Sequence, residues 1–138
     1  MIAAFTFEAL ARLVRETQAR PETDPIRPDQ LLFHDLAFTS MDLLDLIFRI
    51  EDGFGVTIAE GTLHRLARGE LAEDEFARDG LLTPLGRERL MALLSDTPPE
   101  LFPPRVPASN LPGYCTVAAM GRLVEHLLGE KERAACSS

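Results

Sequence analysis

The 138-residue sequence has little cysteine and little histidine: two cysteines, Cys115 and Cys136, and three histidines. Two unevenly placed cysteines cannot form a disulfide framework. No cysteine or histidine pair has the spacing of a zinc motif. We therefore expect no metal site and a reducing, cytoplasmic environment.

Basic residues are also scarce. The chain has 14 Lys and Arg against 22 Asp and Glu, which gives a formal net charge of -8. An acidic surface repels phosphates, so nucleic acid is excluded as a partner. A protein with a basic surface is the natural complement, although solubility alone also explains an acidic chain.

Long apolar runs are missing as well. No stretch approaches the roughly 20 apolar residues of a membrane-spanning helix. The first residues contain Glu8 and Glu16 and have no basic segment before an apolar run, so they do not predict a signal peptide. With 46% hydrophobic residues, we expect one modest core, a single domain over residues 1–138 and no membrane insertion.

Apolar residues recur at helical spacing over most of the chain. They predict an all-α fold, an antiparallel four-helix bundle with helices near 4–19, 40–53, 60–68 and 116–128. Two more helices are expected near 71–79 and 84–94, and Thr83 and Thr116 are expected to cap helices. Prolines between 95 and 113 predict an ordered strap without helix, and residues 129–138 a frayed tail.

The most informative stretch runs from Asp35 to Ile58. It predicts a loop that ends at Ser40, an apolar helix that starts there, and a turn closed by Gly53 and Gly55. We expect Ser40 to be the N-cap, because its side-chain oxygen can accept from unpaired backbone N–H groups of the first turn.

That helix carries two apolar stripes. A helix that is apolar on two sides is either buried on both or exposes one to a partner, and the spacing alone leaves both readings open. The first stripe comprises Leu43, Leu46, Ile47, Ile50 and Phe54. The second stripe comprises Met41, Leu44 and Phe48, with the nearby carboxylates Asp42, Asp45, Glu51 and Asp52.

The order Asp-Leu-Ala-Phe-Thr-Ser-Met-Asp-Leu from Asp35, followed by Glu-Asp-Gly-Phe-Gly-Val-Thr-Ile from Glu51, resembles the acyl carrier protein family. Its usual signature is D-L-G-x-D-S-L-D, then E-E-F-G-I-x-I. Two positions depart from it: Ala37 replaces the glycine and Thr39 replaces the aspartate before the serine. The resemblance implies that Ser40 carries covalent 4′-phosphopantetheine and that the protein is a carrier, not an enzyme.

For this family, the first stripe is expected to line an acyl pocket and the second to dock partner enzymes. The implied partners are a phosphopantetheinyl transferase and acyl-processing enzymes, such as ketosynthases and acyltransferases with basic docking patches, acting on a monomer. The resemblance implies fatty acid, lipid or polyketide biosynthesis. Residues 69–76 also resemble carriers of very long acyl chains for lipid A, and residues 70–113 form an insertion relative to ordinary carriers.

Several alternatives remain beside this reading. One is an aminoacyl or peptidyl carrier of a nonribosomal pathway, and another is an unmodified carrier-like interaction module, for which Ala37 and Thr39 are the support. His34, Asp35 and Ser40 supply the residue types of a hydrolase triad. Residues so close in sequence seldom converge correctly, and no G-x-S-x-G elbow is present, so we disfavour a hydrolase.

Overall fold

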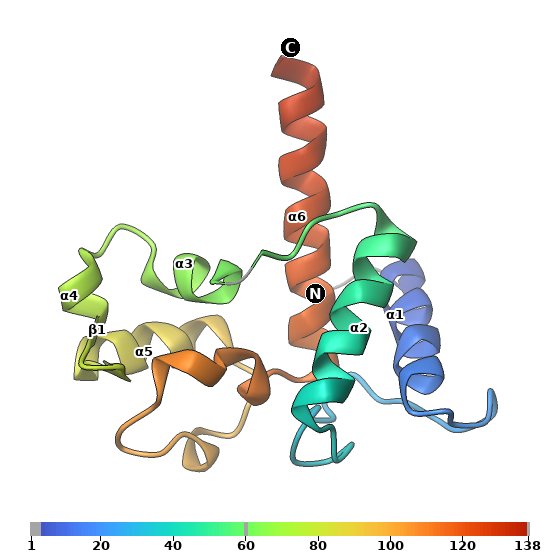
Figure 1. Ribbon diagram of the computed structural model, residues 1–138, viewed down its shortest axis with the longest axis horizontal. Coiled ribbons are helices and arrows are strands. Elements are labelled where there is room, and N and C mark those ends of the chain that lie inside the picture. The colour runs from blue at the N-terminus through green and yellow to red at the C-terminus, as the bar shows by residue number, and fades with distance from the viewer. Residues whose placement is uncertain (1–3, 60, 138) are drawn as a thin grey trace. The chain divides into compact units, whose positions relative to one another are not determined.

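The computed structural model describes residues 4–59 and 61–137 and confirms an all-α fold (Figure 1). The chain divides into two compact units: Met1–Ile58 with Thr116–Ser138, and Ala59–Cys115. Among the described residues, no helix combines the length and the apolar character needed to cross a membrane.

Three helices build the first unit: α1 (Ala4–Thr17), α2 (Ser40–Phe54) and α6 (Val117–Ser137). Each packs against the other two, and α1 runs in the opposite direction to α2 (Figure 1). Their predicted apolar faces meet in a core. Side chains of these helices that are at most 2% exposed include Leu10, Val14, Leu46, Ile50, Met120 and Val124. This packing positions the start of α2.

The long loop between α1 and α2 is fixed to the core. The loop residues Ile26, Leu31 and Leu32 are buried. The backbone N–H of Val117 donates to the carbonyl of Gln30 at 2.9 Å, which ties the loop to the start of α6. Thr116 caps α6 as predicted, because its Oγ1 accepts from Ala119 N at 3.0 Å.

The prediction of a frayed tail after residue 128 is wrong, because α6 continues to Ser137. The extension makes a contact with a residue 76 positions earlier in the chain: the Nζ of Lys131 donates to the carbonyl of Gly55 at 2.8 Å. Gly55 closes α2 in the left-handed conformation at φ 68°, and its N–H donates to Glu51 O. The extension of α6 therefore supplies a cation to the C-terminus of α2.

The second unit contains α3 (Thr62–Arg68), α4 (Glu73–Phe76), α5 (Pro84–Leu93) and a two-stranded antiparallel sheet, β1 (Ala77–Arg78) with β2 (Leu81–Leu82). The predicted helix over 71–79 is wrong beyond Phe76, since the chain becomes extended and pairs Ala77 with Leu82. Asp79 and Gly80, both at positive φ, make the turn. Thr83 caps α5 as predicted.

The proline-rich segment is an ordered strap, as expected. Phe102, Val106 and Leu111 are buried. Arg87 of α5 donates to the carbonyls of Phe102 at 3.0 Å and Pro103 at 2.9 Å. The expectation that prolines exclude all helix is wrong, because two 3-10 segments form, η1 (Pro99–Leu101) and η2 (Ala108–Tyr114). Such short turns tolerate prolines that an α-helix does not.

Candidate functional site

The N-cap of α2 is Thr39, so the prediction that Ser40 caps this helix is wrong. Thr39 has extended backbone angles, and its Oγ1 accepts from Asp42 N at 3.1 Å. Thr39 N donates to the Asp42 carboxylate at 3.0 Å, which completes a capping box. The pattern Thr39-x-x-Asp42 carries this signal in the sequence, whereas Ser40 has Leu43 three residues later.

Ser40 is the first residue of α2, and its side chain is exposed. Within the described part of the chain its hydroxyl has no hydrogen-bond partner. The first-turn N–H groups and the helix dipole favour a negative charge at this end of α2. The position therefore fits a phosphodiester on the Ser40 oxygen, because that oxygen is both accessible and not used by the fold.

The loop before Ser40 is held by buried side chains on either side of one exposed residue. Leu36 is 2% and Phe38 5% exposed. The N–H of Phe38 donates to Leu32 O at 2.9 Å. Between them, Ala37 adopts φ 56°. The site where the family has glycine is thus a left-handed position, which an alanine occupies here at a steric cost.

The first apolar stripe faces the core. Leu43, Leu46 and Ile50 are buried, whereas Ile47 and Phe54 are half-buried. Burial agrees with an inward face, and the acyl-pocket assignment of these five residues stays a prediction.

The second stripe is exposed. Met41 is 72%, Leu44 46% and Phe48 59% accessible, among the most exposed large apolar side chains of the described chain. The reading in which both stripes are buried in the core is therefore wrong. Burial of an apolar stripe of this kind on a partner is favourable.

The carboxylates near this stripe differ in how the fold uses them. Asp42 belongs to the capping box. Asp45 accepts from Arg49 Nε at 3.2 Å, and Glu51 accepts from Ile58 N at 2.8 Å. Asp52 is exposed, and the described residues give it no hydrogen bond or ion pair. Of the four, Asp52 keeps the most charge available to a partner.

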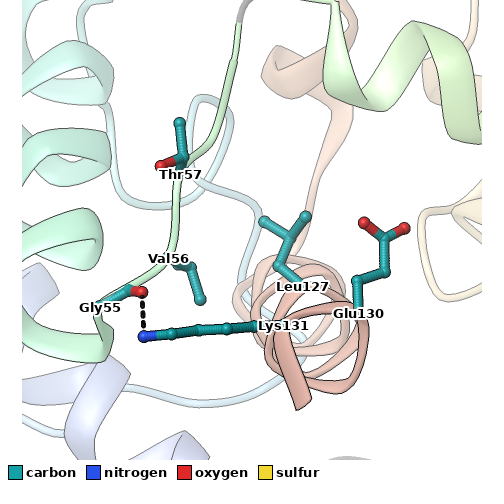
Figure 2. Close-up of a pocket in the computed structure, with 6 residues that line it drawn as sticks. All are labelled: Gly55, Val56, Thr57, Leu127, Glu130 and Lys131. Atoms are coloured by element: carbon teal, nitrogen blue, oxygen red, sulfur yellow. Dashed lines mark hydrogen bonds between the residues drawn. The ribbon is translucent and has the colours of Figure 1, made fainter. Parts of the chain in front are cut away.

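A cavity of about 410 Å³ lies at the other end of α2 (Figure 2). Figure 2 shows Lys131 pointing across it to the Gly55 carbonyl. Its lining residues are Gly55, Val56, Thr57, Leu127, Glu130 and Lys131. None of the five predicted acyl-pocket residues lines it. Along a helix of 15 residues, this cavity is about 20 Å from Ser40.

Of the three residues of the disfavoured hydrolase triad, Asp35 is used in the fold of the loop. The Asp35 carboxylate accepts from Leu31 N at 2.8 Å and thereby helps shape the loop. His34 is exposed. Over residues 4–59 and 61–137, no three His, Cys, Asp or Glu side chains are grouped so that they could hold a metal ion.

Comparison with known proteins agrees with this geometry. Residues 8–67 match the family described as "Phosphopantetheine attachment site". The chain is 31% identical over 72 residues to Acyl carrier protein AcpXL of Brucella melitensis biotype 1, which covers 51% of this chain and 76% of the relative. It is 29% identical over 72 residues to Acyl carrier protein AcpXL of Rhizobium meliloti, covering 51% and 75%.

The family match includes the loop, Ser40 and the whole of α2. Proteins of this kind are carriers rather than enzymes, and their cofactor is 4′-phosphopantetheine. The chain belongs to the acyl carrier protein family.

Proposed function

We propose that this protein carries acyl groups as thioesters on 4′-phosphopantetheine attached to Ser40. The observation that supports this most directly is the exposed Ser40 hydroxyl, which the fold leaves unused because Thr39 caps the helix. The bound group supplies the thiol that holds the acyl chain. The protein contributes the attachment oxygen and first-turn N–H groups that favour the phosphate charge.

The partners in this proposal are a phosphopantetheinyl transferase and acyl-processing enzymes such as ketosynthases and acyltransferases. Their docking surface would be the exposed stripe of Met41, Leu44 and Phe48, with Asp52 as the charge most available to a basic patch. Asp42, Asp45 and Glu51 lie on the same helix and are partly occupied by contacts within the chain. An apolar helix face in a groove is a common mode of recognition.

Fatty acid, lipid or polyketide biosynthesis is the proposed setting. The similarity of residues 69–76 to carriers of very long acyl chains for lipid A favours lipid biosynthesis among these. The first stripe, Leu43, Leu46, Ile47, Ile50 and Phe54, is the proposed wall of the acyl pocket, because it joins buried and half-buried apolar side chains along the same helix.

The attachment is tested by incubating the purified protein with coenzyme A and a broad-specificity phosphopantetheinyl transferase, followed by intact mass spectrometry. We expect a gain of one phosphopantetheinyl group, which Ser40→Ala abolishes. Thr39→Ser is the matched control, since it keeps a hydroxyl cap beside the site and should be modified. No gain with any transferase would instead support the unmodified interaction module.

A further inference from the structure

Two side chains that follow α1 bind the carbonyl oxygen of Leu36, in the loop before Ser40. Gln18 Nε2 donates to this oxygen at 2.8 Å, and Arg20 Nη2 donates at 3.4 Å. Arg20 Nε also donates to Gln18 Oε1 at 2.6 Å. Gln18 and Arg20, which we call the Leu36 clamp, therefore hold each other as well as the loop.

The clamp is itself anchored. Arg20 Nη1 lies 2.8 Å from the carboxylate of Asp24, and both side chains are 31% exposed. The backbone carbonyl of Asp24 accepts from Arg15 Nε of α1 at 2.7 Å. The clamp is thus continuous with the last turn of α1, which packs against α2. A partly buried network of this kind is more rigid than an exposed ion pair.

The clamped carbonyl lies next to Ala37, so the network restrains the backbone conformation of that residue. The Leu36 carbonyl belongs to the peptide group that precedes Ala37, and Ala37 has φ 56°. Rotation of this peptide group would move Ala37 out of the left-handed region, which an alanine prefers to leave. Hydrogen bonds to that carbonyl oppose the rotation. Ser40 follows Ala37 by three residues.

We propose that Gln18, supported by Arg20, is a positioning residue: it holds the Ala37 turn in its left-handed conformation and thereby presents Ser40 to the transferase. This inference rests on the proposed attachment at Ser40. In this proposal, the Gln18 contact compensates for the alanine that stands at position 37 where the family has glycine.

The sharpest variant is Gln18→Glu. It keeps an oxygen for Arg20 but replaces the donor to the Leu36 carbonyl with an acceptor. The matched control is Arg27→Ala, which changes the net charge by the same amount in the same loop. It removes only an exposed contact, to Asp29 at 3.1 Å. Both are made in the natural chain and together with Ala37→Gly, because glycine adopts φ > 0 without steric cost.

The unmodified variants are tested for the rate of phosphopantetheine transfer and for amide hydrogen exchange. Gln18→Glu should lower kcat/KM for transfer by about fivefold, the effect of one lost hydrogen bond. Together with Ala37→Gly, the same change should cost less than about twofold. Exchange of the Phe38 amide should accelerate by about fivefold, while exchange of the Ile50 amide in the core stays unchanged.

Equal transfer rates for Gln18→Glu and Arg27→Ala would overturn the proposal. So would a rate loss that is the same with and without Ala37→Gly, or an unchanged exchange rate at Phe38. If the natural chain is never modified, the proposed attachment fails. The amide exchange then still decides whether Gln18 holds the loop.

Discussion

At the residue scale, the two adjacent hydroxyls of the site have different roles, since one caps α2 and the other is free for attachment. Thr39 accepts from the backbone N–H of Asp42 at the start of α2, and the Ser40 side chain is exposed. A threonine in place of the usual aspartate keeps the cap, because a hydroxyl oxygen can accept the same N–H. This departure from the family signature therefore leaves the start of α2 intact.

Because only Thr39 caps the helix, substitutions of Thr39 and Ser40 should differ in their effect on stability. Thr39→Ala should lower the free energy of unfolding by about 1 kcal/mol, because it removes the N-cap. Ser40→Ala should change it by less than about 0.5 kcal/mol, since the exposed hydroxyl makes no hydrogen bond within the described chain. Urea titration followed by circular dichroism measures both, and a larger loss for Ser40→Ala would contradict the assignment of the cap.

Ala37 gives a second residue-scale prediction. Ala37→Gly should raise the free energy of unfolding by about 0.5–1 kcal/mol, because relief of the left-handed strain exceeds the added entropy of the unfolded chain. The control is Ala9→Gly in the interior of α1, which should lower stability by about 1 kcal/mol. Equal destabilisation by both would show that position 37 is not strained.

At the scale of elements, regular apolar spacing was enough to predict α1, α2, α5 and the core part of α6. Apolar spacing failed in two places, one set by a two-residue turn signal and the other accompanied by a contact between residues far apart in the sequence. The hairpin after Phe76 depends on Asp79-Gly80, a pair typical of tight turns, whose signal the acidic helical pattern obscured. The extension of α6 places Lys131 against the Gly55 carbonyl, a contact that no local pattern indicates.

The Lys131 contact predicts that the extension stabilises α2. Lys131→Met should lower the free energy of unfolding of the first unit by about 0.5–1 kcal/mol, because the last carbonyls of α2 lose a cation. Glu132→Gln, one residue further along the exposed part of α6, is the control and should have little effect. Thermal unfolding at low salt measures the difference, and equal melting temperatures for all three proteins would refute the contact.

In the second unit, α5 approaches α4 so closely that only glycine fits at position 86. A Cβ there would overlap the backbone carbonyl of Phe76. Gly86→Ala should therefore destabilise this unit by about 1–3 kcal/mol. Gly129→Ala on α6 should be tolerated, because a Cβ there would lie 3.4 Å from the end of the flexible Arg133 side chain. Hydrogen exchange resolves the two units, and unchanged protection in α5 would disprove the close approach.

At the scale of the whole molecule, the net charge of -8 gives the chain a field that attracts a basic partner. Sequence reasoning located the acidic helix but could not show which carboxylates the fold occupies. The structure leaves Asp52 exposed and pairs Asp45 with Arg49. The local field on α2 is therefore weaker than its count of acidic residues implies, and the apolar stripe matters correspondingly more.

The contribution of charge on α2 to partner binding is tested by the salt dependence of modification. Asp52→Lys should slow transfer by about threefold at 0.01 M salt and hardly at all at 1 M, because the Debye length falls from about 30 Å to about 3 Å. Glu8→Lys, the same charge change on α1, should have a smaller effect. Equal slowing by both substitutions would indicate general charge rather than a docking site on α2.

The most direct test of the central claim is peptide-mapping mass spectrometry of the protein isolated from its native host. The proposed function predicts a phosphopantetheinyl group on Ser40 and on no other hydroxyl, with an acyl chain on part of the population. The mass of that chain identifies the substrate class. A Ser40 that stays unmodified in cells under all growth conditions would contradict the carrier function.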